Sequence, residues 1–422
     1  MDINTLLKGI DCNCGKHHSC DIVAVYIGNN ATEKLNDLSL NYKSILLVAD
    51  ENTYKAAGCK VNSAINYKIK KELIFPGDVI LIPNEDAIAK VQENLADIDL
   101  IVGIGSGVIQ DLCKYVSFYS KIPYFIVATA PSMDGYASSG AAMITSGMKV
   151  TYSAKVPDAI VADTEVLKDA PLEMIKAGYG DIIGKYSALN DWKLSHIVYD
   201  EFFCQYIYDL MFDALKKTLP LAEKLLERDE ESIGTLMEAL VIAGIAMSFL
   251  GNSRPASGSE HHLSHFFEIT GIINNEYYFP HGVDVLYSTY ITSKIREKLL
   301  TTEFPSVQYK MENELYKSEI ERVYKSVADE CIALQDKMGR YKEERIAAYK
   351  ANEQEIKNVF SEVPSSDKIA RIIDEIKLDL NSFYKVYGNA KLEDAVKYAK
   401  DLKDRYTVLW MYYDICGTES II

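Results

Sequence analysis

The chain has 422 residues, of which 48% are hydrophobic and 25% charged, as in an ordinary globular protein. Its net charge of −16 disfavours nucleic acid and anionic membrane surfaces as partners, and its length favours two domains over a single core. The N-terminus shows no signal peptide, and the apolar run from Ala239 to Leu250 is too short to span a bilayer. Eight scattered cysteines do not suggest a disulfide framework, so we expect a cytoplasmic protein.

Short apolar runs alternate with helical stretches over residues 1–165. The runs have the composition of buried parallel strands and occupy residues 44–50, 79–83, 99–103, 124–128 and 158–162. Helical patterns at 86–95 and 108–119 separate them. Residues 143–152 are predicted to form a β-hairpin inserted into the layer, with its turn at Ser146 and Gly147. The alternation predicts an α/β domain with a mostly parallel sheet.

Long helical patterns with few strand signals fill residues 166–422. Pro171 suits the first turn of a helix, where its missing N–H would have no partner anyway. Apolar residues spaced alternately by four and three predict one helix over 320–338, packed on its own domain or, alternatively, on a second subunit. The charged stretch 342–357 is predicted to be a solvated helix face. We therefore expect an all-helical second domain.

A glycine-rich turn follows the third predicted strand. Gly103, Gly105 and Gly107 lack a Cβ, and the next helix would direct its first N–H groups at a pyrophosphate. The spacing is not the dinucleotide fingerprint, so a tight turn without a ligand is an equal alternative. The hydroxyl-rich loop 129–139, at the end of the next strand, favours the nucleotide. Asp50 ends an earlier strand, where a carboxylate would favour NAD over NADP.

Four of the seven histidines fall within 21 residues. His261 and His265 are four residues apart, so they face the same side of a helix, whereas His262 points away as a surface or packing residue. His281 follows a proline in a rigid turn. Two imidazoles together with the Asp181 carboxylate would bind a divalent metal and leave coordination positions open, as a catalytic metal requires.

A second cluster of ligand types lies near the N-terminus. Cys12, Cys14, His17, His18 and Cys20 have the chemistry to bind a metal. The cluster lacks a second distant pair that would complete a structural zinc site. A turn with incidental thiols is therefore the favoured interpretation.

Five motifs together resemble the sn-glycerol-1-phosphate dehydrogenases, most of all their bacterial branch. The motifs are Val-Gly103-Ile-Gly-Ser-Gly107, Thr129-Ala-Pro-Ser-Met-Asp134-Gly-Tyr-Ala-Ser138, Gly180-Asp181-Ile-Ile-Gly-Lys-Tyr-Ser-Ala-Leu-Asn-Asp-Trp192, Gly258-Ser-Glu-His261-His-Leu-Ser-His265 and His281-Gly282. The resemblance spans roughly residues 20–290. These enzymes belong with glycerol dehydrogenase, the iron-containing alcohol dehydrogenases and dehydroquinate synthase.

The resemblance implies a Rossmann-like α/β domain (1–165) followed by an all-α domain (166–422), as in dehydroquinate synthase, with the active site in the cleft between them. It implies Asp181, His261 and His281 as metal ligands. It implies Asp134 and His265 as catalytic residues beside the substrate, with Asp181 also contacting the substrate. The implied dinucleotide-binding residues are Asp50, Gly105, Gly107, Val108, Ile109, Gln110, Asp111, Thr129, Ala130, Pro131, Ser132 and Ser138.

Lys185 departs from the iron-containing members, which carry a further histidine at that position. A protonated lysine cannot bind a metal, so zinc is favoured over iron and nickel is also suitable. Lys185 would instead act at the catalytic site by attracting a substrate phosphate, with Arg254 as a second candidate.

The implied activity is reversible, NAD(P)-dependent reduction of dihydroxyacetone phosphate to sn-glycerol 1-phosphate, with NAD favoured. One alternative is a polyol dehydrogenase acting on unphosphorylated glycerol. Others are a dehydroquinate synthase-like lyase that uses NAD catalytically, and a sensor without catalysis. We expect a homodimer or larger homo-oligomer, and the pathway, whether phospholipid or polyol phosphate metabolism, is open.

Overall fold

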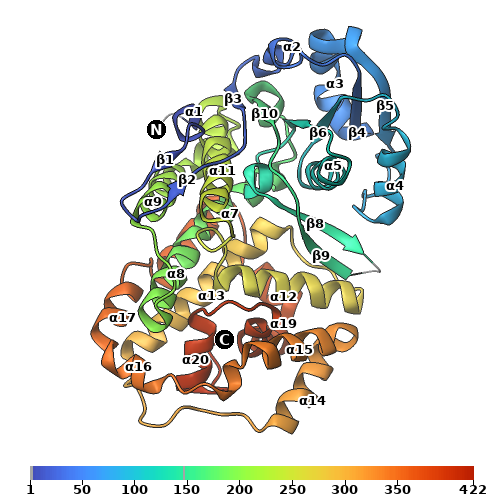
Figure 1. Ribbon diagram of the computed structural model, residues 1–422. Coiled ribbons are helices and arrows are strands. Elements are labelled where there is room, and N and C mark those ends of the chain that lie inside the picture. Colours follow the sequence, from blue (N-terminus) through green and yellow to red (C-terminus); the bar gives the residue numbers. More distant parts are fainter. Residues whose placement is uncertain (1–2, 146–147) are drawn as a thin grey trace. The chain divides into compact units, whose positions relative to one another are not determined.

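The structure is a computed structural model that describes residues 3–145 and 148–422. The chain divides into two compact units (Figure 1). Unit 1 consists of residues 1–182 and 216–252, and unit 2 consists of residues 183–215 and 253–422. The domain boundary predicted after residue 165 stays a prediction.

A six-stranded parallel sheet forms the centre of unit 1. In spatial order its strands are β3 (Ala24–Gly28), β10 (Ala159–Asp163), β7 (Tyr124–Ala128), β6 (Leu100–Gly105), β4 (Ile45–Asp50) and β5 (Ile69–Phe75). Every neighbouring pair is parallel. Helices α3 (Glu51–Ile65) and α5 (Gly107–Ser120) pack on opposite faces: Val61 joins the core on the Val102 face, and Cys113 lies against Gly103 on the other. Burial on both faces explains why the central strands are continuously apolar.

Four of the five predicted strands are confirmed as β4, β6, β7 and β10. The predicted strand at 79–83 is wrong: Val79 and Ile80 are 64% and 90% exposed, and the segment is not a strand. The sequence prediction instead missed β3 and β5, the two edge strands. An edge strand has one neighbour and partial solvent exposure, so β5 carries charged residues within its apolar pattern and lacks a continuous apolar run.

The predicted hairpin is confirmed as β8 (Gly140–Thr145) paired antiparallel with β9 (Met148–Ser153). It forms a separate two-stranded sheet, so the expectation that it is inserted into the main layer is wrong. Its predicted turn, Ser146-Gly147, lies outside the described residues.

Shorter elements complete the α/β part of unit 1. They are α1 (Ile3–Leu6), β1 (Ile10–Asp11), β2 (His17–His18), η1 (Ala31–Glu33), α2 (Lys34–Leu38), η2 (Asn66–Lys68), α4 (Glu85–Glu93), η3 (Asp134–Ala137) and α6 (Thr164–Lys168). Helix α7 (Leu172–Ile183) begins directly after Pro171, as predicted. The second segment of unit 1 adds the end of α9 (Gln205–Thr218), then η4 (Leu219–Leu221), α10 (Ala222–Leu226) and α11 (Glu230–Leu250).

Helix α11 is the apolar helix of unit 1. By length and composition it is the one helix in the described chain that could cross a membrane, but 72% of its most apolar window is buried inside the protein. Gly244 lets it approach η3 so closely that a Cβ there would lie 2.7 Å from the Cβ of Ala137. Ser248 Oγ also donates a hydrogen bond to the Ala137 carbonyl over 2.8 Å. The helix is therefore part of the core of this unit.

Unit 2 is helical throughout its described residues, as predicted. Its elements are α8 (Lys185–Tyr199), the start of α9, α12 (Ser259–Asn274), α13 (His281–Thr301), α14 (Asn313–Tyr324), η5 (Lys325–Val327), α15 (Ala328–Met338), η6 (Arg340–Lys342), α16 (Ile346–Ala351), α17 (Glu353–Phe360), α18 (Ser366–Glu375), α19 (Leu380–Tyr398), η7 (Ala399–Leu402) and α20 (Val408–Cys416). The α/β region followed by a helical region confirms the predicted fold class.

Two details of unit 2 differ from the predictions. The single helix expected over 320–338 is interrupted at Lys325, whose φ of 46° is incompatible with a continuous α-helix, so α14 and α15 are separate. The stretch 342–357 is not simply a solvated face, because Arg345 is 3% exposed and forms an ion pair with Asp414 over 2.6 Å.

Candidate active site

The order of the strands places two candidate loops at one point of the sheet. From β4 the chain goes outward to β5 and then returns to β6 on the other side of β4. The connections from the carboxyl ends of β4 and β6 therefore diverge, which is where open parallel sheets bind ligands. Asp50 ends β4, and the glycine-rich turn follows β6.

The glycine-rich turn joins β6 to the 14-residue helix α5. A Cβ on Gly105 would lie 2.6 Å from the Ile109 side chain, so glycine is required there for packing. Beyond the adjoining residues and the backbone of α5, the nearest atom to a Cβ on Gly107 would be a side-chain carbon of Met133 at 3.9 Å, and Ser106 makes no side-chain cap hydrogen bond to α5. The first N–H groups of α5 have no side-chain cap from Ser106 and could receive an anionic phosphate group.

A buried lysine holds the next loop against α5. Lys114 Nζ donates to the carbonyls of Gly135, at 3.0 Å, and Gly140, at 2.7 Å. It also forms an ion pair with Asp111 over 3.3 Å. Burial lowers the pKa of Lys114, and the Asp111 charge opposes that shift. The sequence interpretation missed this residue; its signal was a lysine one turn after Asp111 on an otherwise apolar face.

The predicted dinucleotide residues separate into two groups by burial. Gly105, Ile109, Gln110, Thr129, Ala130 and Pro131 are buried. Gln110 Nε2 donates to the Tyr136 carbonyl over 3.0 Å, which fastens α5 to η3. Gly107, Val108, Asp111, Ser132 and Ser138 are half-buried and border solvent. Direct contact with a nucleotide stays a prediction for both groups, and it suits the second group better.

Asp50 has a structural role that the sequence did not indicate. Its Oδ1 accepts hydrogen bonds from the backbone N–H groups of Asn52 and Thr53, each at 2.9 Å, and so caps α3. Thr53 completes a capping box by accepting from the Asp50 N–H. A contact with the ribose stays a prediction and would have to use Oδ2.

Two predicted catalytic carboxylate residues meet within unit 1. Asp181 is fully buried near the end of α7, and its Oδ2 accepts a hydrogen bond from the backbone N–H of Asp134 over 3.0 Å. That bond fixes the Asp181 carboxylate relative to the loop that follows β7. The backbone N–H of Asp134 therefore contributes to the candidate site in addition to the Asp134 side chain.

Unit 2 gathers three of the predicted histidines. His261 and His265 lie one turn apart in α12, and His281 is the first residue of α13. The centroids of the His261 and His281 rings are 5.1 Å apart, and His265 lies 6.0 Å and 5.4 Å from them. His262 is fully buried, which confirms packing rather than a surface position.

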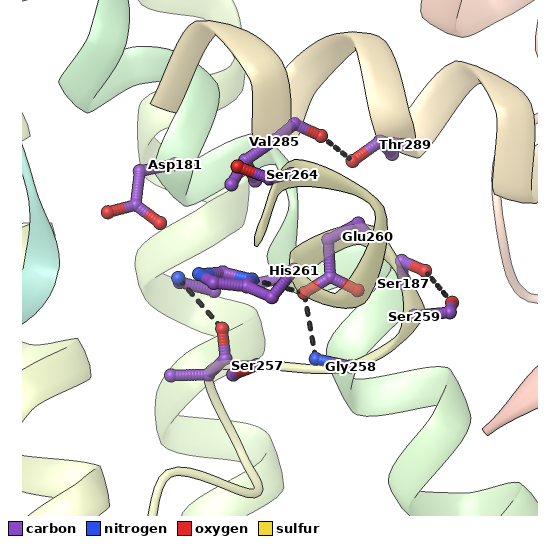
Figure 2. A network of polar contacts seen from close by, with 12 residues as sticks. Asp181, Ser187, Ser257, Gly258, Ser259, Glu260, His261, Ser264, Val285 and Thr289 are labelled. Carbon is purple, nitrogen blue, oxygen red and sulfur yellow. Dashed lines mark hydrogen bonds and ion pairs between the residues drawn. The ribbon is translucent and has the colours of Figure 1, made fainter. Parts of the chain in front are cut away.

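Glu260 orients the His261 ring (Figure 2). His261 Nδ1 lies 2.6 Å from Glu260 Oε1, and the same oxygen accepts the Gly258 N–H over 2.9 Å. Burial, followed by the Asp191 charge, raises the pKa of Glu260 to about 7. An imidazole whose Nδ1–H is held by a carboxylate presents Nε2 to a metal, the usual arrangement around ligand histidines. The sequence interpretation overlooked Glu260, although an acid directly before a ligand histidine was visible.

His281 is oriented in a similar way, since its Nδ1 lies 3.3 Å from Ser264 Oγ. Burial lowers the pKa of His261 well below its usual value, and the charges of Lys185, His281 and His265 lower it further. A neutral imidazole is the form that binds metal. The donor set in unit 2 therefore fits a divalent metal ion.

The predicted phosphate-binding cations occupy different surroundings. Lys185 is fully buried, and its Nζ donates to the Ala256 carbonyl over 2.9 Å, so this ammonium cannot bind a metal. Arg254 is 1% exposed and contacts Glu201 over 2.7 Å and the Tyr406 carbonyl over 2.8 Å. The charge of Lys403, which the sequence did not single out, also lowers the pKa of His261, after burial and the larger effects of Lys185, His281 and His265.

Comparison with known proteins shows the family. The family model for iron-containing alcohol dehydrogenase matches residues 26–171. A protein of Geobacillus thermodenitrificans named glycerol-1-phosphate dehydrogenase, NAD(P)+, is 37% identical over 65% of this chain and 70% of its own. A Bacillus licheniformis protein of the same name is 30% identical over 94% of this chain and 90% of its own. This chain belongs to the glycerol-1-phosphate dehydrogenase family.

Membership of the glycerol-1-phosphate dehydrogenase family confirms the predicted resemblance and makes the chain an oxidoreductase. A solved structure described as a probable glycerol dehydrogenase of Sinorhizobium meliloti has a TM-score of 0.61, with 14% identity over 95% of this chain and 93% of its own. At that identity the likeness supports the fold alone.

Proposed function

We propose that the protein catalyses reversible, NAD(P)-dependent and metal-dependent reduction of dihydroxyacetone phosphate to sn-glycerol 1-phosphate. Relatives named glycerol-1-phosphate dehydrogenase support the reaction class. The observation that carries the proposal is the carboxylate-oriented His261 ring beside His281, because a ligand pair of this kind suits a catalytic metal.

We propose Asp181 of unit 1 and His261 and His281 of unit 2 as the ligand set, as the resemblance to the family implies. The local sequence supports the inclusion of Asp181. Asp181 precedes Lys185 by four residues in a motif that resembles the family. Lys185 in turn donates to Ala256, five residues before His261. One carboxylate and two imidazoles leave coordination positions for a substrate.

The protein's own part in the reaction is orientation and proton transfer. Bound cofactors would supply the remaining chemistry, hydride from the reduced nicotinamide and Lewis-acid polarisation of the C2 carbonyl from the metal. Asp134 fixes Asp181 through its backbone N–H, and Glu260 fixes His261. His265 is half-buried beside both ligand histidines and is the group we assign to deliver the proton to the C2 oxygen.

Positive charge near the imidazoles would bind the substrate phosphate. We assign this role to Lys185, supported by Lys403, because both act electrostatically on His261. Arg254 is a weaker candidate, since its guanidinium is engaged with Glu201. We further propose zinc as the metal, with nickel as the alternative. The Asp50 carboxylate supports NAD over NADP, because it would repel a 2′-phosphate.

A cytoplasmic location is part of the proposal, and it is supported by the scattered positions of the eight cysteines, which do not suggest a disulfide framework. A homo-oligomeric state stays a prediction.

The deciding experiment compares two ketones. Metal-reconstituted protein is assayed for NADH oxidation with dihydroxyacetone phosphate and with dihydroxyacetone, and the product is analysed on a chiral column. We expect turnover only with the phosphorylated ketone and sn-glycerol 1-phosphate as product. Equal rates would assign the protein to polyol dehydrogenation. Absence of NADH oxidation despite bound metal would favour a lyase that uses NAD catalytically.

A further inference from the structure

The N-terminal segment carries a second group of metal-ligand types that the proposed reaction does not use. Strands β1 and β2 pair antiparallel, with Ile10 opposite His18, and residues 12–16 form the turn between them. The Cys12 N–H donates to the Lys16 carbonyl over 3.0 Å, and the Gly15 N–H donates to the Cys12 carbonyl over 3.0 Å. These bonds hold Cys12 and Cys14 in one tight turn.

Glycine is required in this turn. Gly15 has a φ of +84°, in the left-handed region that residues with side chains rarely adopt. The reversal brings the start of β2 back towards Cys14. Because side chains alternate along a strand, His17 and His18 face opposite ways. His17 is exposed and pairs with Asp11 over 2.8 Å, whereas His18 is fully buried.

The His18 ring is held as a ligand histidine is held. Its plane stacks on Phe249 of α11, with ring centroids 5.7 Å apart, and its Nδ1 donates to the Phe249 carbonyl over 3.2 Å. A backbone carbonyl on Nδ1 fixes the tautomer with its lone pair on Nε2. That Nε2 lies 3.2 Å from Cys14 Sγ. Sulfur and nitrogen ligands on one tetrahedral zinc are about 3.5 Å apart, so the spacing needs little adjustment.

We propose that Cys12, Cys14 and His18 bind a structural zinc ion, separate from the catalytic metal. Binding converts the two thiols to thiolates and releases their two protons to solvent, with no change of oxidation state. Through His18 and Phe249 the site would fasten the N-terminal hairpin to α11 within unit 1.

Cobalt substitution of the full-length protein distinguishes this site from the catalytic one. Thiolate ligands give cobalt an intense near-ultraviolet charge-transfer band, which a carboxylate–imidazole site cannot produce. We expect the band in the wild type and in His261→Ala, and its loss in the double variant Cys12→Ser/Cys14→Ser. The variant Cys59→Ser, which removes an exposed thiol of α3, serves as the matched control and should retain the band. Because His261→Ala removes only the proposed catalytic ligand, failure of the proposed function would leave this result unchanged.

Metal content and thiol protection complete the test. The wild type should hold one more equivalent of zinc than the double variant, and zinc should slow alkylation of Cys12 and Cys14 measured by mass spectrometry. A wild type without the charge-transfer band, or alkylation of Cys12 and Cys14 at the same rate with and without zinc, would overturn the proposal even if the double variant folds poorly.

Discussion

At the scale of single residues, the candidate site depends on groups that orient its ligands. Glu260 is fully buried and shares one oxygen between the His261 ring and the Gly258 N–H. The two bonds keep the carboxylate from rotating, and the carboxylate keeps the ring from rotating. The position of one ligand nitrogen is therefore set by its neighbour in sequence.

Replacing Glu260 should weaken metal binding without removing a ligand. Glu260→Gln loses the charge that holds the Nδ1–H, and losses at such supporting positions are about 10–100-fold in metal affinity. His261→Ala should lose the catalytic metal and turnover altogether. Competition with a chromophoric chelator measures the affinities. Glu268→Gln, in the same helix, is the control, and equal affinities of Glu260→Gln and wild type would refute the orienting role.

A second prediction concerns stability and pH. Asp284 is buried, which raises its pKa well above the usual 3.8, and the Tyr387 hydroxyl lies 2.8 Å from each of its oxygens. The folded protein therefore retains a proton that the unfolded chain releases. This contribution to the free energy of unfolding is complete below pH 3.8 and is lost as the pH rises through the raised pKa.

The substitution Asp284→Asn should remove the loss of stability that the wild type undergoes as the pH rises. The free energy of unfolding of the variant minus that of the wild type should be larger at about pH 8 than at about pH 5, as measured by urea unfolding. Asp374→Asn, at an exposed position of α18, provides the comparison. A constant difference between Asp284→Asn and wild type across this range would contradict the shifted pKa.

At the scale of elements, α7 can pack closely on the loop that follows β7 because Gly178 has no side chain at the contact. A Cβ on Gly178 would lie 1.8 Å from the Pro131 carbonyl oxygen, a contact with backbone that no rotation can relieve. The helix carrying Asp181 and the loop carrying the predicted nucleotide residues therefore have one fixed separation within unit 1.

Gly178→Ala should destabilise the protein by about 1–3 kcal/mol and weaken NAD binding, because α7 or the loop must move. Gly234→Ala in α11 is the matched control: its Cβ would meet Thr164 at an ordinary 3.4 Å. That substitution should stabilise the protein by about 0.5–1 kcal/mol, because alanine is more favourable than glycine inside a helix. Thermal unfolding and NAD titration measure both variants, and a neutral Gly178→Ala would show that the two elements move independently.

The strands that were predicted correctly from the sequence are those buried on both faces of the sheet. Strands β4, β6, β7 and β10 are interior strands whose apolar runs reflect burial on both faces. Edge strand β5 lacks that signature because charged residues interrupt it, and the apolar run at 79–83 is exposed. Edge strand β3 does have an apolar sequence, which the prediction overlooked. The break at Lys325 was invisible because the apolar periodicity continues across it.

Residue type and spacing were enough to predict the proposed ligand residues of the candidate site. The scarcity of histidines and the family motifs indicated Asp181, His261 and His281. Glu260 and Lys114 were visible in the sequence but were not distinctive, because an acid beside a histidine and a lysine in a helix are common. Their roles depend on the burial and the partners that tertiary packing provides.

At the scale of the whole molecule, unit 1 is assembled from two separate stretches of chain. Its sheet is complete at Asp163, yet α11, which packs on η3 and α6, belongs to the stretch 216–252. A chain ending at Ile182 should therefore lack a cooperative unfolding transition and fail to bind NAD.

A chain ending at Asn252 contains both stretches and should regain the transition and NAD binding. Circular dichroism during urea unfolding and NAD titration test the two chains together. Cooperative unfolding of the shorter chain would show that α11 is dispensable to the core of unit 1.

The late position of α11 also has a consequence during synthesis. A ribosome completes all six strands of the sheet before it begins residues 164–229, and α11 follows only after those. At roughly 5–20 residues per second, the nascent sheet waits several seconds with the surface that α11 will cover still open to water. Chaperones that act on emerging chains would meet this protein in that interval, and mutations that weaken the contact between α11 and η3 should lower the yield of folded enzyme more than its final stability.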